Sequence, residues 1–573
     1  MRNILRESVV ERECVVADAV QRIRMLSRRP QPGALLQGLA SLLWIPQAAL
    51  VAMAIQHMAT GRVFADLLAP AAGVLLLGLA RAWSESQGAR RMFAQARHAV
   101  GELRAHVART LAARSPLDRT RPASGQAASV LAEQVDLLMP FLLRYQPARW
   151  RVMLVPPLIL LAVASQTWVA ALVLLLAAPL IPLFMAIVGW RAQAASQAQL
   201  QEQGGMNAFL LDRLRGLATL RGLGATRMTA RRLRRHADAL RLRTLAVLRI
   251  AFLSSAVLEL FAALGVAMVA VYVGFHLLGQ LEFGAWSGRL DLGRSLFVLM
   301  LAPAFFEPLR ELSATWHDRA AGEAALASAQ ALAHGGMALP GLAHGAATAV
   351  SGTPPAVSMR ALRLRGVEGP HLRVGTAPFT LEVAAGERVA LYGASGSGKS
   401  TLLALLAGQL ALPAGRIEIG GVPMLDETAA PLRRRIGWMG QKPHVFAGSV
   451  RANLAPGAPL PSKPEALDAL RFAGLESVAQ AHPAATLGEG GSGLSGGELA
   501  RLALARLALR APETDLLLVD EPTAHLDSET ARQVTEQLLV LARGRTLIVA
   551  THDPVLAGRM DRVVRLDAAE GVA

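Results

Sequence analysis

The stretch GASGSGKST, residues 393–401, follows the apolar run RVALY and precedes TLLALLAG, so it connects a predicted strand to a predicted helix. Its glycines allow backbone N–H groups to converge on phosphate oxygens, and the N-terminus of the following helix favours an anion. We expect Lys399 to reach the β- and γ-phosphates of a nucleotide and Ser400 to ligate Mg²⁺. The predicted loop residues are Gly393, Ser395, Gly396, Gly398, Lys399, Ser400 and Thr401.

A second motif, DLLLVDEP at residues 515–522, places two carboxylates after four apolar residues. This pattern predicts a buried strand with both acids at its carboxyl end. We expect Asp520 to hold Mg²⁺ through water, and Glu521 to orient the attacking water or to accept its proton. Successive side chains of a strand point in opposite directions, which suits two separate roles.

Outward from these motifs, the runs ERVALYG, RIEIGG, DLLLVDE and TLIVATH predict strands that alternate with helices. The prediction for residues 357–573 is therefore an α/β P-loop nucleotide-binding domain. Residues 334–356 are rich in Gly, Ala and Pro, so we interpret them as a linker. Residues 1–333 remain as a separate domain.

The composition predicts that this first domain lies in a membrane. The chain has 573 residues, of which 53% are hydrophobic and 18% charged, and its mean hydropathy is +0.37; these values exclude disorder for the chain as a whole. Residues 33–61 lack charge and residues 63–83 nearly so, and 152–190 is long enough for a helical hairpin that begins near residue 140. A fifth span is predicted over 248–278, and a sixth, weaker one around 295–306.

The arginines set the predicted orientation. Net charge is +17, and lysine occurs only three times. Arginines concentrate in the N-terminal tail and in the segments 84–139 and 191–247, which we interpret as helical extensions of the spans. The opposite loops carry only Arg62 and Arg289, so the positive-inside rule places both termini and the nucleotide-binding domain in the cytoplasm. This placement argues against nucleic acid as a partner; residues 231–243 could instead contact anionic lipid headgroups.

The stretch LSGGE at 494–498 lies between the two nucleotide motifs, and here the sequence resembles the ATP-binding cassette (ABC) family, whose signature it matches. The resemblance implies that Ser495 and Gly497 clamp the γ-phosphate of ATP held by an opposite domain. It also implies an Mg²⁺-sensing Gln441, a switch His552 that contacts the γ-phosphate, and a D-loop Asp527. The implied signature residues are Leu494, Ser495, Gly496, Gly497 and Glu498. Residues 358–369 lack the aromatic on which this family often stacks adenine.

The order of the two domains along the chain, with the membrane domain first and the cassette second, resembles the fused exporters of that family. Longer stretches resemble the CydD-type subunits of the CydDC exporters of reduced thiols: AAPLIPLFMAIVGW (177–190), FLLDRLRGLATLRGLGA (209–225), RIAFLSSAVLELF (249–261) and LAPAFFEPLRELSATWHDRAAGEAA (301–325). This resemblance implies a CydC-type partner in a heterodimer, export of cysteine or glutathione to the periplasm across the bacterial inner membrane in support of cytochrome bd assembly, and haem as a ligand or cargo. It also implies that the bends around 114–126 and 215–226 dock on the cassette.

Charged groups near the inner span ends are the candidate cargo residues. We expect Glu259 to pair with Arg310, which would gate the inner cavity or contact a zwitterionic thiol peptide; the alternative is that both are surface charges. His317 could ligate haem iron or bind a carboxylate, although a lone histidine is more often structural. The single cysteine, Cys14, excludes an intrachain disulfide and cysteine-rich metal sites.

Three other functions stay open at this point. The first is an exporter of the same fold that carries lipid, drug or peptide. The second is a soluble cassette ATPase that acts on nucleic acid, which the predicted spans contradict. The third is a regulatory or haem-sensing membrane ATPase without transport.

Overall fold

The structure, a computed structural model, describes two compact units of the chain. It leaves undescribed residues 1–14, 27–28, 62–64, 123, 180–194, 287, 342–352, 364–365, 369–370, 374–377, 477–485, 488–493 and 567–573, with single residues and pairs between 196 and 215. The helical unit comprises Val15–Ala108 and Ser124–Ala333, and the second unit comprises Arg109–Ala123 with the chain from His334 onward. We call the second one the nucleotide unit.

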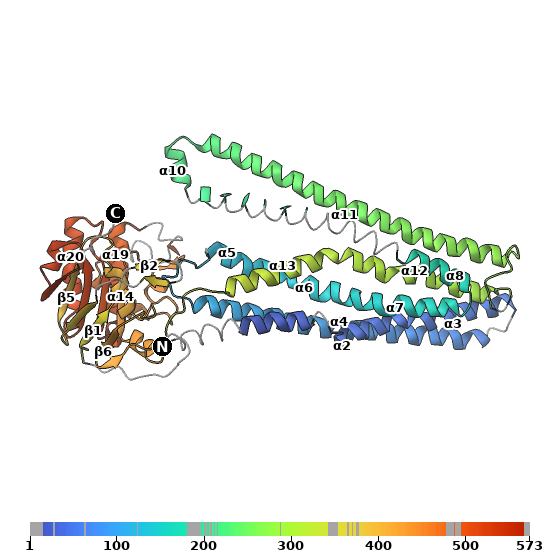
Figure 1. The fold of residues 1–573 in the computed structure, drawn as a ribbon, viewed down its shortest axis with the longest axis horizontal. Helices are drawn as coiled ribbons and strands as arrows, with labels where there is room; N and C mark the ends of the chain where they lie inside the picture. Colours follow the sequence, from blue (N-terminus) through green and yellow to red (C-terminus); the bar gives the residue numbers. More distant parts are fainter. Residues whose placement is uncertain are drawn as a thin grey trace. The chain divides into compact units, whose positions relative to one another are not determined.

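The helical unit consists of long helices that run side by side (Figure 1). Figure 1 also shows α11 running away from α12 and α13 toward α10. The described helices of this unit are α2 (Pro32–Leu42), α3 (Trp44–Ala59), α4 (Ala65–Ala112), α5 (Ser124–Ser129), α6 (Leu138–Pro140), α7 (Gln146–Ala164), α8 (Trp168–Ala177), α10 (Leu217–Gly222), α11 (Thr226–Leu277), α12 (Leu292–Ala314) and α13 (Trp316–Ala333).

Five helical segments among the described residues are long and apolar enough to cross a membrane: Pro32–Ala59, Ala65–Ala112, Ser124–Ala164, Ala256–Leu277 and Leu292–Ala333. The expected hairpin within 152–190 is confirmed as far as it is described, because α7 and α8 are separated only by residues 165–167. The predicted sixth span is present in the segment Leu292–Ala333. Its helix α12 runs past the charge-free residues 295–306 through Glu307, Arg310 and Glu311 to Ala314, and each of these charged groups has an oppositely charged partner in the structure.

Small residues let the membrane helices pack closely, as is usual where helices meet in a membrane. A Cβ added at Gly265 of α11 would lie 2.5 Å from Cζ of Phe306 on α12, so the ring packs against the α11 backbone. Likewise, a Cβ at Gly88 of α4 would lie 2.7 Å from the carbonyl oxygen of Gly33 in α2. These contacts surround an apolar core of α7, α8, α11 and α12 side chains.

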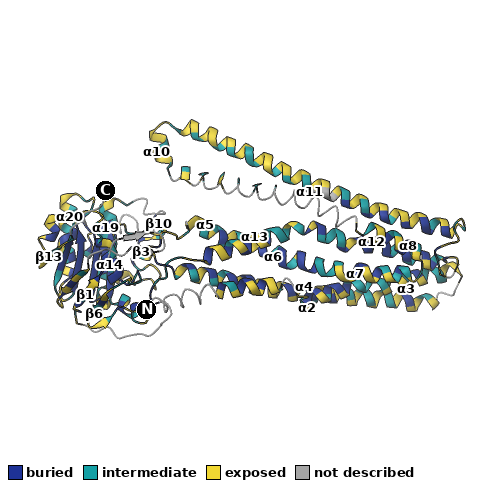
Figure 2. Ribbon diagram, viewed as in Figure 1, coloured by how far each residue is buried: buried dark blue, intermediate teal, exposed yellow. Residues whose placement is uncertain are grey.

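The nucleotide unit is built on two main β-sheets, whose strands are largely buried (Figure 2). The larger sheet has the order β13-β5-β12-β11-β8 with parallel pairing throughout. The other has the order β4-β1-β6-β7 and is antiparallel. The strand bounds are β1 Val357–Leu362, β2 Gly366–Glu368, β3 His371–Arg373, β4 Phe379–Val383, β5 Arg388–Tyr392, β6 Arg416–Ile419, β7 Val422–Pro423, β8 Ile436–Met439, β9 Gly448–Ser449, β10 Thr486–Leu487, β11 Leu516–Asp520, β12 Thr546–Thr551 and β13 Arg562–Arg565.

All four strands expected from the sequence are present as β5, β6, β11 and β12. The helices that matter for the site are α14 (Lys399–Leu406), α19 (Gly496–Arg510) and α20 (Ser528–Leu541). The others are α15 (Ala429–Arg434), α16 (Val450–Leu454), α17 (Lys463–Phe472) and α21 (Pro554–Ala557). Buried apolar side chains of α19, α20 and the central strands form one core cluster beneath the sheet.

The bend that follows α4 belongs to the nucleotide unit, as the family resemblance implies for residues around 114–126. Arg114 and Ala338 form an antiparallel bridge, and Ser115 N donates to Met337 O at 2.8 Å. Ser115 Oγ donates to the carbonyl of Gln409, just beyond the C-terminus of α14, at 2.7 Å. The bend near 215–226 lies in the helical unit.

Asp118 fastens this bend to the start of the predicted linker. Its Oδ2 accepts from Met337 N at 2.9 Å and its Oδ1 from Thr120 N at 2.9 Å. Burial raises the pKa of Asp118, but hydrogen bonds from Thr120 and Met337 and the charge of Arg114 outweigh it, so the pKa is lowered overall. A Cβ at Gly336, whose φ is +100°, would lie 2.7 Å from Asp118 Oδ2, so this turn requires glycine.

Candidate nucleotide-binding site

The nucleotide motifs meet at one edge of the larger sheet because the strands that precede them are parallel neighbours. β5 ends at the phosphate loop, β11 at Asp520 and Glu521, β12 at His552, and β8 just before Gln441. Ligands of open α/β sheets bind outside the carboxyl ends of the strands. Motifs that are more than 100 residues apart in the sequence are thus assembled by strand order.

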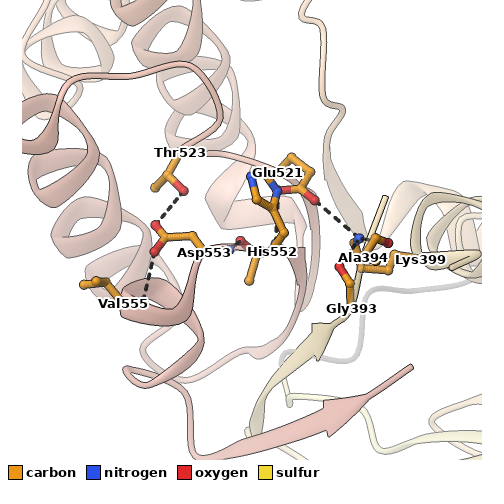
Figure 3. A network of polar contacts seen from close by, with 9 residues as sticks. Gly393, Ala394, Lys399, Glu521, Thr523, His552, Asp553 and Val555 are labelled. Atoms are coloured by element: carbon orange, nitrogen blue, oxygen red, sulfur yellow. Dashed lines mark hydrogen bonds and ion pairs between the residues drawn. The ribbon is translucent and has the colours of Figure 1, made fainter. Parts of the chain in front are cut away.

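The phosphate loop has the backbone geometry that its glycines predict. Gly396 and Gly398 have φ of +87° and +95°, which residues with a Cβ rarely adopt. Lys399 begins α14 and is 6% exposed. Its Nζ donates to the carbonyls of Gly393 at 2.7 Å and Ala394 at 3.0 Å, so the ammonium lies inside the loop (Figure 3).

Glu521 lies between the lysine and the switch histidine. Its Oε1 is 3.6 Å from Lys399 Nζ, and its Oε2 is 2.7 Å from His552 Nδ1 (Figure 3). The side chain is 8% exposed, and the residue has a φ of +48°, a strained backbone that turns the carboxylate into the site. The structure therefore brings three of the predicted residues, Lys399, Glu521 and His552, into one polar cluster.

Asp520 is placed to hold a cation. Burial raises the pKa of Asp520 and the neighbouring Glu521 charge raises it further, whereas a hydrogen bond with Ser400 and the Lys399 charge lower it. Within the described part of the chain its buried Oδ1 has no hydrogen-bond partner. A carboxylate and a hydroxyl at one point are the oxygen ligands that Mg²⁺ takes in nucleotide sites, so these residues fit the ion.

Two residues that the sequence analysis missed hold the switch histidine in place. Thr523 Oγ1 donates to Asp553 Oδ2 at 3.0 Å, and Asp553 Oδ1 caps α21 by accepting from Val555 N at 2.9 Å (Figure 3). Asp553 directly follows His552, so the contact ties the loop after β12 to the loop after β11. The sequence does carry a signal for Asp553, because Asp followed by Pro, here Pro554, is typical of the start of a helix.

The signature residues begin α19. Ser495 is its N-cap, and with Glu498 it forms a capping box, in which Ser495 N donates to Glu498 Oε2 at 2.7 Å. Backbone hydrogen bonds from Ser495 lower the pKa of Glu498, so the box is charged near neutral pH. Ser495 and Gly496 are exposed, Leu494 and Gly497 partly so. None of the hydrogen bonds described in the structure joins them to the phosphate loop.

The remaining cassette residues lie at exposed positions. Gln441 follows β8 and is exposed. Asp527 is the N-cap of α20 and accepts from Thr530 N at 2.9 Å. The structure thus brings Gly393, Lys399, Ser400, Asp520, Glu521 and His552 together, whereas among the described residues no hydrogen bond joins the signature residues to them.

In the helical unit, Arg310 pairs with Glu259 as expected: Nη1 lies 2.9 Å and 3.0 Å from the two carboxylate oxygens. A second cluster was missed. Arg151 of α7 donates to both oxygens of Glu311 at 2.8 and 2.9 Å and to Gln37 of α2 at 3.4 Å. His317 is exposed on α13. Among the described residues no three His, Cys, Asp or Glu side chains are grouped to hold a metal.

Comparison with known families agrees with this architecture. The family described as "ABC transporter" matches residues 377–524, and "ABC transporter transmembrane region" matches residues 52–300. Across the whole chain, the structure is similar to that of a bacterial Atm1-family ABC exporter with ATP bound, with a TM-score of 0.73 and 22% identity; the match covers 97% of this chain and 95% of the other. At that identity the likeness shows the fold.

Curated relatives match over most of their length. The glutathione/L-cysteine transport system ATP-binding/permease protein CydD of Escherichia coli (strain K12) is 35% identical over 90% of this chain and 87% of its own. The CydC protein of the same named system from Bacillus subtilis (strain 168) is 30% identical over 78% of this chain and 75% of its own. A lipid A-core flippase of Chromobacterium violaceum (strain ATCC 12472 / DSM 30191 / JCM 1249 / CCUG 213 / NBRC 12614 / NCIMB 9131 / NCTC 9757 / MK) is 28% identical over 70% of this chain and 66% of its own.

A multi-pass helical unit, family models that match its membrane and ATP-binding parts, and relatives matched over most of their length lead to one conclusion. The chain belongs to the ABC transporter family, as an exporter half-transporter whose ATPase is coupled to transport.

Proposed function

We propose that this half-transporter exports reduced thiols, cysteine or glutathione, from the cytoplasm to the periplasm and so supports cytochrome bd assembly. The observation that carries the proposal is the 35% identity to a protein named as part of a glutathione/L-cysteine transport system, over nine-tenths of this chain. The match includes the membrane half, where cargo is bound, and not only the cassette. The lower identity to a lipid flippase favours the thiol assignment.

The proposed assembly is a heterodimer with a CydC-type half-transporter in the bacterial inner membrane, with the cassette and both termini in the cytoplasm. Its support is the exposed helix start at Ser495, which has a free N-terminal surface for a phosphate but no described contact with the chain's own phosphate loop. In the heterodimer, Ser495 and Gly497 clamp ATP held by the partner, and Asp527 lies beside that junction.

At its own half-site, the proposed roles follow the geometry. Lys399 and the loop N–H groups hold the phosphates, and Ser400 with Asp520 holds Mg²⁺, with Gln441 sensing it. Mg²⁺ neutralises charge on the phosphates when bound. Glu521 accepts the proton of the attacking water, and His552, 2.7 Å from it, contacts the γ-phosphate. ATP phosphates draw Lys399 away from Glu521 and leave that carboxylate available to water.

For the cargo, we assign Arg310 and Glu259 as charged contacts at the inner mouth. A zwitterionic thiol carries one group of each sign, and the two residues lie on separate helices with their side chains 38% and 68% exposed. The alternative, that both are surface charges only, predicts no effect on cargo affinity. Exposed His317 has no described partner that would orient it toward cargo.

The second candidate cargo is haem. A further alternative is a lipid or drug, carried by an exporter of the same fold. Among the described residues, His317 is exposed and lies in no group of three metal-binding side chains. Haem export therefore rests on resemblance alone, and thiol export is the function we favour.

Proteoliposomes that contain the chain and its co-expressed partner test the proposal. ATP-dependent uptake of labelled cysteine or glutathione into inside-out vesicles is the expected result, and Glu521→Gln serves as the matched transport-dead control. Uptake of haem or lipid without thiol uptake would overturn the thiol assignment. Cargo-stimulated hydrolysis without any uptake would indicate a regulatory ATPase instead.

A further inference from the structure

A three-residue charge cluster lies where α11 and α12 begin to diverge. Among the described side chains of α11, Leu258 is the first in the apolar core shared with α12, and Gly265 packs against Phe306 farther along. In the other direction α11 leaves α12 (Figure 1) and contacts the preceding helical stretch, as Thr244 with Gln199 and His236 with Glu202 show. Glu259 therefore sits at the edge of the α11–α12 contact.

Arg310 is shared at this point between two carboxylates. Its Nη1 donates to Glu259 on α11 at 2.9 and 3.0 Å, and its Nη2 donates to Glu307, one turn earlier on α12 itself, at 2.7 Å. Only the first contact joins two helices. When α11 and α12 separate, Glu259 leaves with α11, but Glu307 stays with the arginine because both belong to α12.

The two carboxylates also oppose each other, because like charges that converge on one guanidinium repel. Glu307 thus weakens the Arg310–Glu259 contact while the helices are together, and it keeps Arg310 paired after they part. Both effects favour separation. Without Glu307, Arg310 would have no carboxylate to pair with after the helices separate. The Arg310–Glu259 pair would then hold α11 and α12 together more strongly.

We propose that Glu307 is a positioning residue that makes the Arg310–Glu259 contact a reversible latch between α11 and α12. The latch sets how readily the inner ends of these helices part during the transport cycle. This role concerns the movement of any ABC exporter half-transporter and does not depend on which cargo is carried.

The next residue of α12 supplies the fixed side of the latch. Glu311 is held by Arg151 of α7, whose side chain is 16% exposed, and Arg151 also reaches Gln37 of α2. Consecutive residues of a helix point about 100° apart, so α12 is tied to α7 and α2 on one side and to α11 on the other. The Arg310–Glu259 contact is the more exposed of the two, with side chains 38% and 68% exposed.

The test compares two isosteric variants that each remove one carboxylate from the same arginine. In the full chain with Cys14→Ser, spin labels at Ala237→Cys on α11 and Ala324→Cys on α13 report the distance between the diverging helices, in nanodiscs, by pulsed electron resonance. Glu259→Gln should raise the ratio of separated to closed molecules, and Glu307→Gln should lower it, each by up to about five-fold, as expected of an exposed ion pair.

The control is Glu282→Gln, which removes a carboxylate from another exposed pair, with Arg289 at 3.0 Å, and should leave the ratio unchanged. Thermal unfolding of every variant checks the fold. Glu307→Asp, which keeps the charge, should restore part of the separated population. Shifts of Glu259→Gln and Glu307→Gln in the same direction, or no shift in either, would overturn the proposal.

Discussion

Glu521 combines two demands that are rarely met by one side chain. It is buried and shares contacts with Lys399 and His552, yet it must present a basic oxygen to water. Its positive φ of 48° is the backbone cost of that placement. The following Pro522 and the Thr523–Asp553 hydrogen bond hold the turn in this conformation.

Glu521→Gln should reduce ATP hydrolysis by at least about 100-fold, since the amide cannot accept the proton of water. ATP should still bind, because Lys399 and the loop remain. Phosphate release and retention of labelled ATP, measured on the chain with its co-expressed partner, check both parts. Glu513→Gln, at an exposed position in the same segment of sequence, is the control. Undiminished hydrolysis would show that Glu521 is not the base.

At the scale of elements, buried polar contacts join segments that are far apart in sequence. Ser115 and Asp118 attach the bend after α4 to the residues near 337 and to the end of α14. Arg151 and Glu311 attach α7 to α12. In each contact a carboxylate accepts hydrogen bonds from another segment, so each is sensitive to the loss of one partner.

Asp118→Asn should destabilise the nucleotide unit by about 1–3 kcal/mol, because an amide has a single acceptor oxygen and leaves either Met337 N–H or Thr120 N–H without its acceptor. The sign of its pH dependence follows from the lowered pKa of Asp118. A carboxyl whose pKa is lower in the folded state stabilises the fold above its unfolded pKa, and this contribution is lost as pH falls through the folded value. The difference in unfolding temperature between wild type and variant should therefore be full at pH 7 and shrink below about pH 4. A difference that does not vary with pH would contradict a charged Asp118.

The Arg151–Glu311 pair should show coupling in a double-mutant cycle. Arg151→Met or Glu311→Gln alone leaves a partly buried group without its partner and should cost about 1–3 kcal/mol, while the double variant should cost less than the sum. Thermal unfolding in detergent measures the loss of stability of each single variant and of the double variant. The same cycle on Arg289 and Glu282, an exposed pair, should give a coupling near zero. Additive losses at Arg151 and Glu311 would mean that the two side chains do not stabilise each other.

At the scale of the whole molecule, the sequence predicts a multi-pass protein whose arginines lie on one side. In the Cys14→Ser background, a membrane-impermeant maleimide should label Gly61→Cys, at the end of α3, in intact spheroplasts. It should label Ala237→Cys, in the Arg-rich part of α11, only after permeabilisation. Equal labelling of both positions would refute the orientation.

Local signals account for much of what could be predicted from sequence. GASGSGKST, LSGGE and DLLLVDEP each place polar or charged side chains at the end of a strand or the start of a helix. The cassette and its candidate site could therefore be predicted from short stretches of sequence. The Arg151–Glu311 pair could not be predicted, because 160 residues separate its partners and only helix packing brings them together. The end of α12 could not be set from hydropathy, because its charged residues pair with partners on α7 and α11 that hydropathy does not register. Thr523 and Asp553 escaped because each has an ordinary local role.

The close contact between Gly265 on α11 and Phe306 on α12 is the point about which α11 would tilt, as a lever does about its fulcrum. At 1.5 Å per residue, about 58 Å of helix extends from Gly265 to Thr226, and about 18 Å extends to Leu277. A tilt of about 5° at the fulcrum would move the far end by about 5 Å, roughly three times the displacement at the near end. Replacing Gly265 with a larger residue would move this point of contact. The displacement of the Thr226 end of α11 for a given tilt thus depends on a residue with no side chain.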